Sequence, residues 1–358
     1  MKIERYLILW SCLLLICFNI ITMIAIFSPD EFLYRGDAFG YFNDTLKVLF
    51  SDIAVTCSYL EAIFKRKPLR EFWKIYVSLH KKSPGEDINI FDIKSLWQNG
   101  RFLIIFYVIV FCEALAMFVF IVWQCKNRHL ILFWSIFSPL AYATYIRNMQ
   151  FIFYIELIRL ELVKLQHDLS LMVDYSRFVA YGCGFKGFEE FLRRKLVEKQ
   201  KQYQMIYEMF EHFQNTFGLS IVAVLSMIYV RILVDSYFAY YSVYNKWNRL
   251  EVTLLCPSLL EIPVFLITSK NCMDVIKLIT FNLHSIISQF NNTNSIISTQ
   301  LQNFSLQILH QRICINGIGI TRMDGYMLTR AIGSITTYMI FFIQFMPKFT
   351  NFQDDKKN

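Results

Sequence analysis

Long uncharged apolar runs constrain this chain more than any other feature. Residues 7–27 follow the charged start Met-Lys-Ile-Glu-Arg-Tyr and contain no Asp, Glu, Lys or Arg. At about 1.5 Å per residue, a helix over such a run is long enough to cross the hydrocarbon core of a bilayer. A cleaved signal peptide begins similarly, but its apolar core is only about 7–15 residues long. The run therefore predicts a first membrane span.

The composition agrees with a membrane protein. The chain has 358 residues, of which 55% are hydrophobic, 17% aromatic and 18% charged, whereas soluble domains have about a quarter charged residues. The formal charge of +8 comes from basic residues beside the apolar runs, so it indicates topology rather than nucleic-acid binding. The nine cysteines form no CxxC pattern and behave as small hydrophobic residues. We expect neither a metal nor a cofactor.

Six further segments have the same apolar character, although several carry isolated charges. They predict membrane spans at about residues 41–64, 102–124, 130–154, 216–238, 253–269 and 328–347. The second span contains four charged residues between Asp44 and Glu61, and we expect it inside a helix bundle because charged side chains avoid lipid. In the fifth span, Arg231 and Asp235 are four residues apart and are spaced for an ion pair within one helix.

Other stretches are too polar to span a membrane, but their apolar residues recur at the spacing of a helix. Residues 155–215 continue the fourth span as an amphipathic helix and then mix both charges at helical spacing. Residues 290–325 are polar and include another amphipathic helix, as do residues 65–101 around residues 72–79. Residues 182–187 match GxGxxG, but no strand precedes them, so the match predicts a turn rather than a dinucleotide site. We also expect a loop at residues 239–252 and, after residue 269, a polar, Asn/Gln-rich stretch to about residue 312.

Basic residues are distributed unequally between the two sides of the predicted spans. Residues 65–101 and 155–215 each contain nine lysines and arginines, whereas the opposite loops contain only Arg35, Lys126, Arg128, Lys246 and Arg249. The positive-inside rule then places the N-terminus in the cytoplasm and, with seven spans, the C-terminus outside. This orientation is the inverse of a G-protein-coupled receptor. Three N-glycosylation sequons begin at Asn43, Asn291 and Asn303, of which the last two are predicted to be cytoplasmic.

Ionisable residues within the predicted spans are candidates for a functional site. A structural ion pair between helices is an equally good explanation for Glu113, Arg147, Asp235 and Glu261. Aromatic residues in the outer halves of the third to fifth spans are typical of an interfacial belt, but together with an acidic residue they can also line a small-molecule cavity. The ligand-pocket candidates are Glu113, Trp123, Trp134, Phe137, Tyr142, Tyr145, Tyr237 and Glu261.

The last span carries polar side chains on one stripe. On a helix, Thr337, Phe341, Gln344 and Phe345 are spaced at i, i+4, i+7 and i+8 and share a face. Lipid cannot satisfy a hydroxyl or an amide, so this face is predicted to meet protein or line a pore. A hydrogen bond from Gln344 to a neighbouring helix is the simpler alternative.

The same residues carry a resemblance to a known family. Thr337-Tyr338, five mostly apolar residues and Gln344-Phe345 resemble the TY-(five apolar)-QF signature at the C-terminus of insect gustatory receptors. Residues 317–324 resemble the glycine- and aspartate-containing segment that precedes it, although isoleucine replaces the usual aromatic residues. Beyond these motifs the resemblance is one of span number and spacing.

The resemblance implies an all-α membrane protein with seven transmembrane helices in one domain, residues 1–358. It implies a cytoplasmic N-terminus, an extracellular C-terminus and a cytoplasmic anchor formed by residues 155–215 and 290–325. The implied function is a gustatory receptor of chemosensory neurons that acts as a plasma-membrane ligand-gated non-selective cation channel. A small-molecule tastant would open a pore in a homo- or hetero-tetramer, with Thr337, Phe341, Gln344 and Phe345 at the gate.

Other classes of function remain as alternatives. A G-protein-coupled receptor predicts the opposite orientation in the membrane, and a transporter predicts internal repeats that the sequence lacks. An obligate co-receptor subunit of a heteromeric channel is an alternative within the family. An enzyme is not expected, because the chain contains no HExxH, P-loop or GxSxG motif and its six histidines are scattered.

Overall fold

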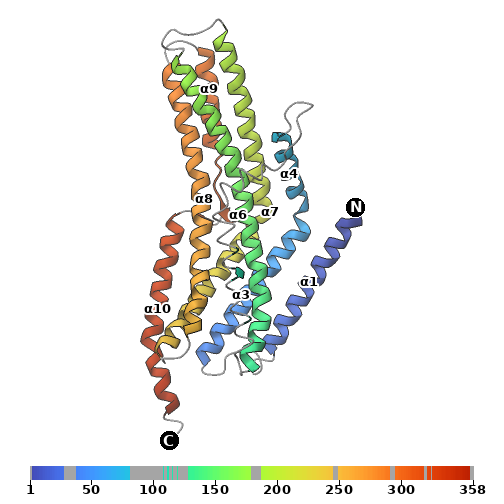
Figure 1. The fold of residues 1–358 in the computed structure, drawn as a ribbon, viewed down its shortest axis with the longest axis vertical. Coiled ribbons are helices and arrows are strands. Elements are labelled where there is room, and N and C mark those ends of the chain that lie inside the picture. The colour runs from blue at the N-terminus through green and yellow to red at the C-terminus, as the bar shows by residue number, and fades with distance from the viewer. Residues whose placement is uncertain are drawn as a thin grey trace.

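The computed structural model of the protein is an elongated bundle of long α-helices (Figure 1). It describes residues 2–27, 38–80, 128–178, 187–244, 249–290, 295–317, 321–323 and 325–354, together with residues 108, 111, 112, 115 and 119. The helices are α1 (Lys2–Phe27), α3 (Ala38–Phe64), α4 (Arg66–His80), α6 (Arg128–Phe178), α7 (Phe188–Tyr244), α8 (Arg249–Phe290), α9 (Ser295–His310) and α10 (Gly325–Asp354). Two short strands, β1 (Asn316–Gly317) and β2 (Thr321–Arg322), pair antiparallel before α10.

Three helices are much longer than a bilayer is thick. α6, α7 and α8 contain 51, 57 and 42 residues, which is roughly 75, 85 and 65 Å of helix against about 30 Å of hydrocarbon. All three continue into the upper part of Figure 1, where α9 packs against α7 and α8. We call this part, formed by α9, the ends of α6 and α8 and the start of α7, the helical extension.

One loop prediction is wrong. The loop expected at residues 239–252 is mostly helical, because α7 continues to Tyr244 and α8 begins at Arg249. Residues 239–244 contain no Gly or Pro that would end a helix. The polar stretch expected directly after residue 269 is also helical as far as Phe290. Its buried residues repeat at helical spacing and are Val275, Ile279, Leu283 and Ile286.

The GxGxxG match ends at a turn. Gly187 directly precedes α7 and has a φ of +92°, a left-handed conformation that glycine adopts without steric cost. Its carbonyl accepts a hydrogen bond from the Phe191 N–H at 3.0 Å. The turn prediction is confirmed at this residue, whereas residues 182–186 lie outside the described part of the chain.

The helical extension contains partly buried hydrogen bonds as well as an apolar core. The hydroxyl of the buried Tyr203 in α7 donates to the Gln311 carbonyl at 2.7 Å, and the Gln307 amide of α9 donates to Gln204 of α7 at 2.8 Å. The amphipathic helix predicted from residues 296–309 is confirmed as α9. Because these polar groups satisfy one another between two helices, they fix the register of α9 on α7.

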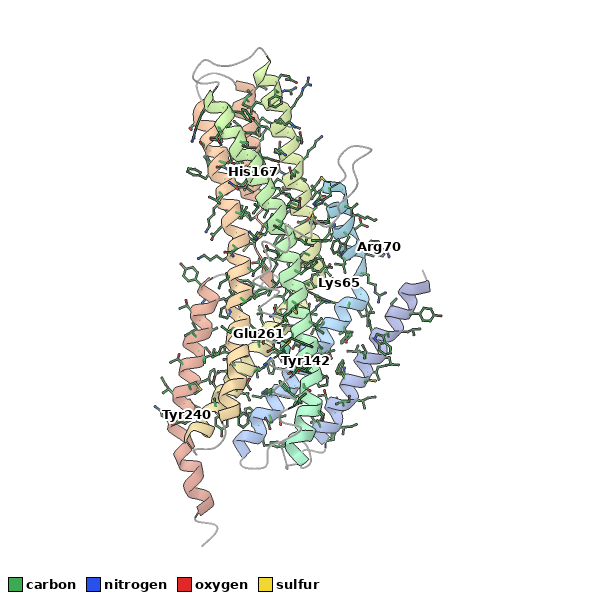
Figure 2. All side chains as sticks on the ribbon, viewed as in Figure 1. Lys65, Arg70, Tyr142, His167, Tyr240 and Glu261 are labelled. Carbon is green, nitrogen blue, oxygen red and sulfur yellow. The ribbon has the colours of Figure 1, made fainter. Side chains whose placement is uncertain are left out.

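The polar segment after α3 forms the amphipathic helix that the sequence predicts. α4 buries Phe72 and Tyr76, four residues apart, and packs mainly against α7. The Phe72 ring meets the Tyr154 ring of α6 edge to face, with centroids 5.1 Å apart. Basic residues at the start of this segment, Lys65 and Arg70, lie in the same half of the molecule as the helical extension (Figure 2).

A charged cluster joins the end of α4 to α6. The Nδ1–H of His80 donates a hydrogen bond to the Tyr76 carbonyl at 2.9 Å. The Nε2 atom of the same ring lies 3.3 Å from the Glu161 carboxylate. Lys164 donates to the same carboxylate at 2.8 Å. The hydrogen bond to Glu161 raises the pKa of His80 above its ordinary value. Burial raises the pKa of Glu161, but the hydrogen bonds from His80 and Lys164 outweigh this effect and lower it.

We predict that this cluster makes the protein less stable as pH rises. A group with a raised folded-state pKa contributes stability that is complete below its unfolded pKa, here 6.5, and that is lost as pH rises through the folded pKa. The Tm of the detergent-solubilised protein should therefore fall between about pH 6 and about pH 8. His80→Gln should flatten this dependence, whereas His167→Gln, on an exposed histidine of α6, should not. An identical slope in both variants would contradict the assignment.

Candidate functional site

Charged side chains of α3 are buried where α3 packs against α6 and α7, as the sequence predicts. Lys47 and Glu61 are each only 5% exposed, and Asp44 is also buried. α3 packs against α7 and α6, and its charged groups meet partners on those helices. Two separate polar networks result, one around Arg231 and one around Arg147.

The Arg231 network joins four helices. Arg231 of α7 lies 3.5 Å from Asp235 on the same helix and 3.4 Å from Glu261 of α8, and it donates to the Tyr145 hydroxyl of α6 at 2.9 Å. Lys47 of α3 donates to Asp235 at 2.5 Å. The ion pair expected within α7 is confirmed. The two cations and two carboxylates of this network cancel in charge, which lowers the cost of burying them.

Aromatic rings surround the same charges. The Lys47 ammonium lies 4.5 Å from the centre of the Phe137 ring, and the Arg231 guanidinium lies 5.0 Å from that of Tyr145. Asn148, one turn after Tyr145, is fully buried near Glu261. Its amide faces the Glu261 carboxylate, and neither of its polar atoms makes a hydrogen bond of good geometry with the described residues. The site therefore combines apolar walls, paired charges and an amide able to bind a further polar group.

The structure brings together three of the predicted pocket residues, Phe137, Tyr145 and Glu261. Tyr237 is also buried, but it packs beside Met339 of α10. The ring of the half-buried Tyr142 lies tilted against that of Phe111, with centroids 5.3 Å apart. Figure 2 shows Tyr142 and Glu261 in the lower half of the molecule, away from the helical extension.

Three pocket candidates are not described in detail. Glu113 and Trp123 lie outside the described residues, and Trp134 belongs to α6 without a described side chain. Sequence reasoning missed Lys47 and Asn148 as members of the site. The charge of Lys47 within an apolar segment was a usable signal, whereas an uncharged amide such as Asn148 gives none.

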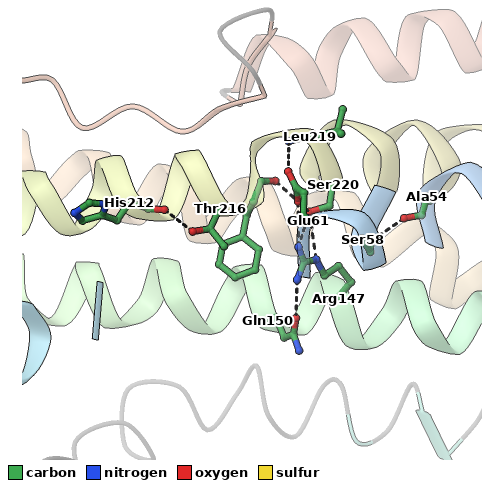
Figure 3. A network of polar contacts seen from close by, with 10 residues as sticks. Ala54, Ser58, Glu61, Arg147, Gln150, His212, Thr216, Leu219 and Ser220 are labelled. Carbon is green, nitrogen blue, oxygen red and sulfur yellow. Dashed lines mark hydrogen bonds and ion pairs between the residues drawn. The ribbon is translucent and has the colours of Figure 1, made fainter. Parts of the chain in front are cut away.

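The Arg147 network is a structural clamp at the end of α3 (Figure 3). Arg147 of α6 donates to the Glu61 carboxylate at 3.1 Å, and the Leu219 N–H of α7 donates to the other oxygen at 2.9 Å. The Ser220 hydroxyl also donates to Glu61. The guanidinium lies 4.5 Å from the centre of the Phe217 ring. For Arg147 the structure thus favours an interhelical ion pair over a ligand-binding role.

The last helix attaches to the bundle along one side only. Ile335 packs against the main hydrophobic core, and Met339, four residues later, packs against Tyr237 of α7. Thr337, Phe341 and Gln344 point away from this contact and are exposed. The side chain of Phe345 lies outside the described residues. α10 therefore presents the predicted polar stripe to its surroundings rather than to its own bundle.

The segment before α10 is held closely against α7 and α8. A Cβ atom on Gly317 would lie 2.2 Å from Val222 Cγ2 of α7, so only glycine fits at this contact. The Ser269 hydroxyl of α8 donates to the Met323 carbonyl at 3.0 Å. These contacts fix the point at which α10 begins.

Comparison with known proteins identifies the family. Residues 2–349 match the sequence profile of the 7tm chemosensory receptor family. The chain belongs to this family. The receptor also resembles the solved structure of the insect olfactory receptor OR5 from Machilis hrabei in complex with eugenol, with a TM-score of 0.59 and 12% identity over 95% of this chain and 88% of that chain. No curated protein sequence matches the receptor.

The family settles the fold class as an all-α receptor of the seven-transmembrane type rather than an enzyme. Among the described residues, α1 and α7 are long and apolar enough to cross a membrane by composition alone. In α3 and α8, charged residues interrupt the apolar pattern, and the structure buries them in pairs. These helices therefore remain compatible with a bilayer.

We predict that Arg147→Met will strongly destabilise the receptor. The substitution leaves the buried Glu61 carboxylate without its cation, which costs about 3–5 kcal/mol in buried pairs and should lower the Tm in detergent by several degrees. Arg193→Met is the matched control, because Arg193 pairs with Glu190 three residues earlier on α7 and both side chains are exposed. Adding Glu61→Leu to Arg147→Met should restore part of the loss. Equal effects of the two arginine substitutions would contradict the clamp.

Proposed function

We propose that the receptor is a gustatory chemoreceptor that acts as a ligand-gated non-selective cation channel in the plasma membrane of chemosensory neurons. The observation that carries the proposal is the stripe of Thr337, Phe341 and Gln344 on α10, which bears the TY…QF signature and is exposed in the single chain. Hydroxyl and amide groups are costly against lipid. They are suited to a water-filled pore between subunits.

The pore is formed by α10 from four subunits, either identical or from different gustatory receptors. Phe341 and Phe345 form apolar rings that exclude water when the pore is closed, and Gln344 replaces part of the hydration of a permeating cation. The helical extension serves as the cytoplasmic anchor between subunits. Its exposed apolar residues support a protein contact there and include Phe281, Ile296, Leu306 and Leu309.

The tastant binds at the Arg231 network. The related olfactory receptor structure contains the small molecule eugenol, and the network here offers aromatic rings with the buried amide of Asn148 beside Glu261. Tyr237 lies two residues beyond Asp235 and packs on Met339 of α10. A ligand that changes the position of Arg231 or Asp235 can therefore shift α10 and widen the pore.

An alternative within the family is a co-receptor subunit that conducts only with a partner. A G-protein-coupled receptor is disfavoured by the basic residues of the two long polar segments. Lys65 and Arg70 lie in the same half of the molecule as His167 in the helical extension (Figure 2), which supports one common cytoplasmic side.

We predict a cytoplasmic N-terminus and an extracellular C-terminus. On intact cells, antibody should label a C-terminal epitope tag but not an N-terminal one, and both should be labelled after permeabilisation. Asn303 is exposed on α9 but should carry no glycan, because the anchor faces the cytoplasm. Labelling of the N-terminus alone, with a glycan on Asn303, would contradict this topology and favour a G-protein-coupled receptor.

We predict that substitutions on the α10 stripe will change ion conduction. Phe345→Ala should increase the resting current because the apolar ring becomes wider, and Gln344→Ala should change the relative permeability of Na⁺ and K⁺. The measurement is whole-cell recording of receptor-expressing cells with equal surface expression. Thr336→Ala is the control for Thr337→Ala. Each hydroxyl donates to a carbonyl of α10 at 2.9 Å, but only Thr337 belongs to the stripe, so only Thr337→Ala should change ion conduction. Unchanged current and selectivity in Gln344→Ala and Phe345→Ala would refute the pore assignment.

A further inference from the structure

A groove lies on the outer side of the bundle, between α1 and α3. It has a volume of about 660 Å³ and follows α1 from Leu15 to Phe27, with Thr56 of α3 on its other wall. The twelve steps from Leu15 to Phe27 along a helix correspond to a length of about 18 Å. The apolar lining is open, since Ile20 is 53% and Phe27 80% exposed. None of the groove's lining residues belongs to the Arg231 network, so the two sites are separate.

One end of this apolar groove contains two polar side chains. The Asn19 amide nitrogen donates both of its protons, to the Leu15 carbonyl at 2.9 Å and to the Thr56 hydroxyl oxygen at 3.2 Å. The Asn19 amide oxygen and the Thr56 hydroxyl proton have no partner among the described residues. Both side chains are half-buried and line the groove. One acceptor and one donor therefore remain available side by side.

The neighbouring hydrogen bond between α1 and α3 leaves no hydroxyl proton unused. The Thr22 hydroxyl donates to the Asp52 carboxylate at 3.1 Å, so its proton is used. Asn19 lies near the middle of the apolar run 7–27, where the bilayer contains no water to satisfy an open donor or acceptor. A bound molecule that supplies a hydroxyl group at this depth would gain two hydrogen bonds that it cannot form in lipid.

We propose that this groove is a second ligand site, which binds a hydrophobic alcohol that enters from the bilayer. The hydroxyl of the alcohol donates to the Asn19 amide oxygen and accepts from the Thr56 hydroxyl, while its hydrocarbon part lies along α1 towards Phe27. A phospholipid acyl chain has no polar atom at this depth, and its ester groups stay at the interface. An alcohol matches both the apolar walls and the polar end of the groove.

The test uses the full-length receptor in lipid nanodiscs and a photoreactive diazirine analogue of farnesol, with cross-links mapped by mass spectrometry. Farnesol should compete with labelling of the α1 peptide. Its methyl ether keeps the hydrocarbon but cannot donate, and it should compete about fivefold less well, as expected for one lost hydrogen bond.

Substitutions distinguish the contribution of Asn19 and Thr56 to binding from that of the apolar lining. Asn19→Leu should abolish the preference for farnesol over its ether, because it removes the acceptor of the hydroxyl proton. Thr56→Val should weaken competition by both compounds and keep the preference, because an ether oxygen also accepts from Thr56, whereas Thr56→Ser, which retains the hydroxyl, should change neither. Thr22→Val is the matched control, because it removes the other hydrogen bond between α1 and α3 without touching the groove. A preference that is absent in the unmodified receptor, or that persists in Asn19→Leu, would overturn the proposal and leave a surface covered by ordinary lipid.

Discussion

Pairing of charges inside the membrane bundle is the constraint on which the rest of the structure depends. α3 carries Lys47 and Glu61 into an environment where a single uncompensated charge would prevent insertion or force the side chain out to the interface. Asp235 and Arg147 supply the opposite charges from α7 and α6. Each pair can form only in one register and orientation of its helices. Charge compensation therefore selects which helices are neighbours, a choice that packing of similar apolar side chains leaves open.

The closely held bundle and the loosely attached last helix have different roles in this arrangement. Gly317 lets the segment before α10 approach α7 closely, and the Ser269 hydroxyl binds the same segment from α8. Beyond that point α10 contacts α7 and α8 along one side through Met327, Ile335 and Met339, and the Tyr229 hydroxyl of α7 donates to the Ser334 hydroxyl. A helix fixed at its start and only lightly packed along its length can change its tilt at small cost in buried area, which a gate requires.

The fold class could be predicted from the sequence because apolar length and charge asymmetry are local properties. The same reasoning identified Asp235 with Arg231 and the burial of Lys47, since a charge within an apolar run must find a partner. It could not supply the partners across helices, because the pairing of Arg147 with Glu61 joins residues far apart in sequence. The loop expected at residues 239–252 was wrong because a tyrosine-rich stretch is polar without being a helix breaker. The burial of the Asn148 amide depends on three-dimensional packing alone.

The continuity of α6, α7 and α8 has a mechanical consequence. A helix without a break transmits rotation as a stiff rod, and α7 with its 57 residues is roughly 85 Å long. A tilt of only about 2° at the Arg231 network would displace the far end of such a rod by up to about 3 Å. Because the amides of α9 lock onto α7, this displacement would move the whole helical extension as one piece. A small tilt at one end of these long helices would therefore produce a larger displacement at the other end of the receptor.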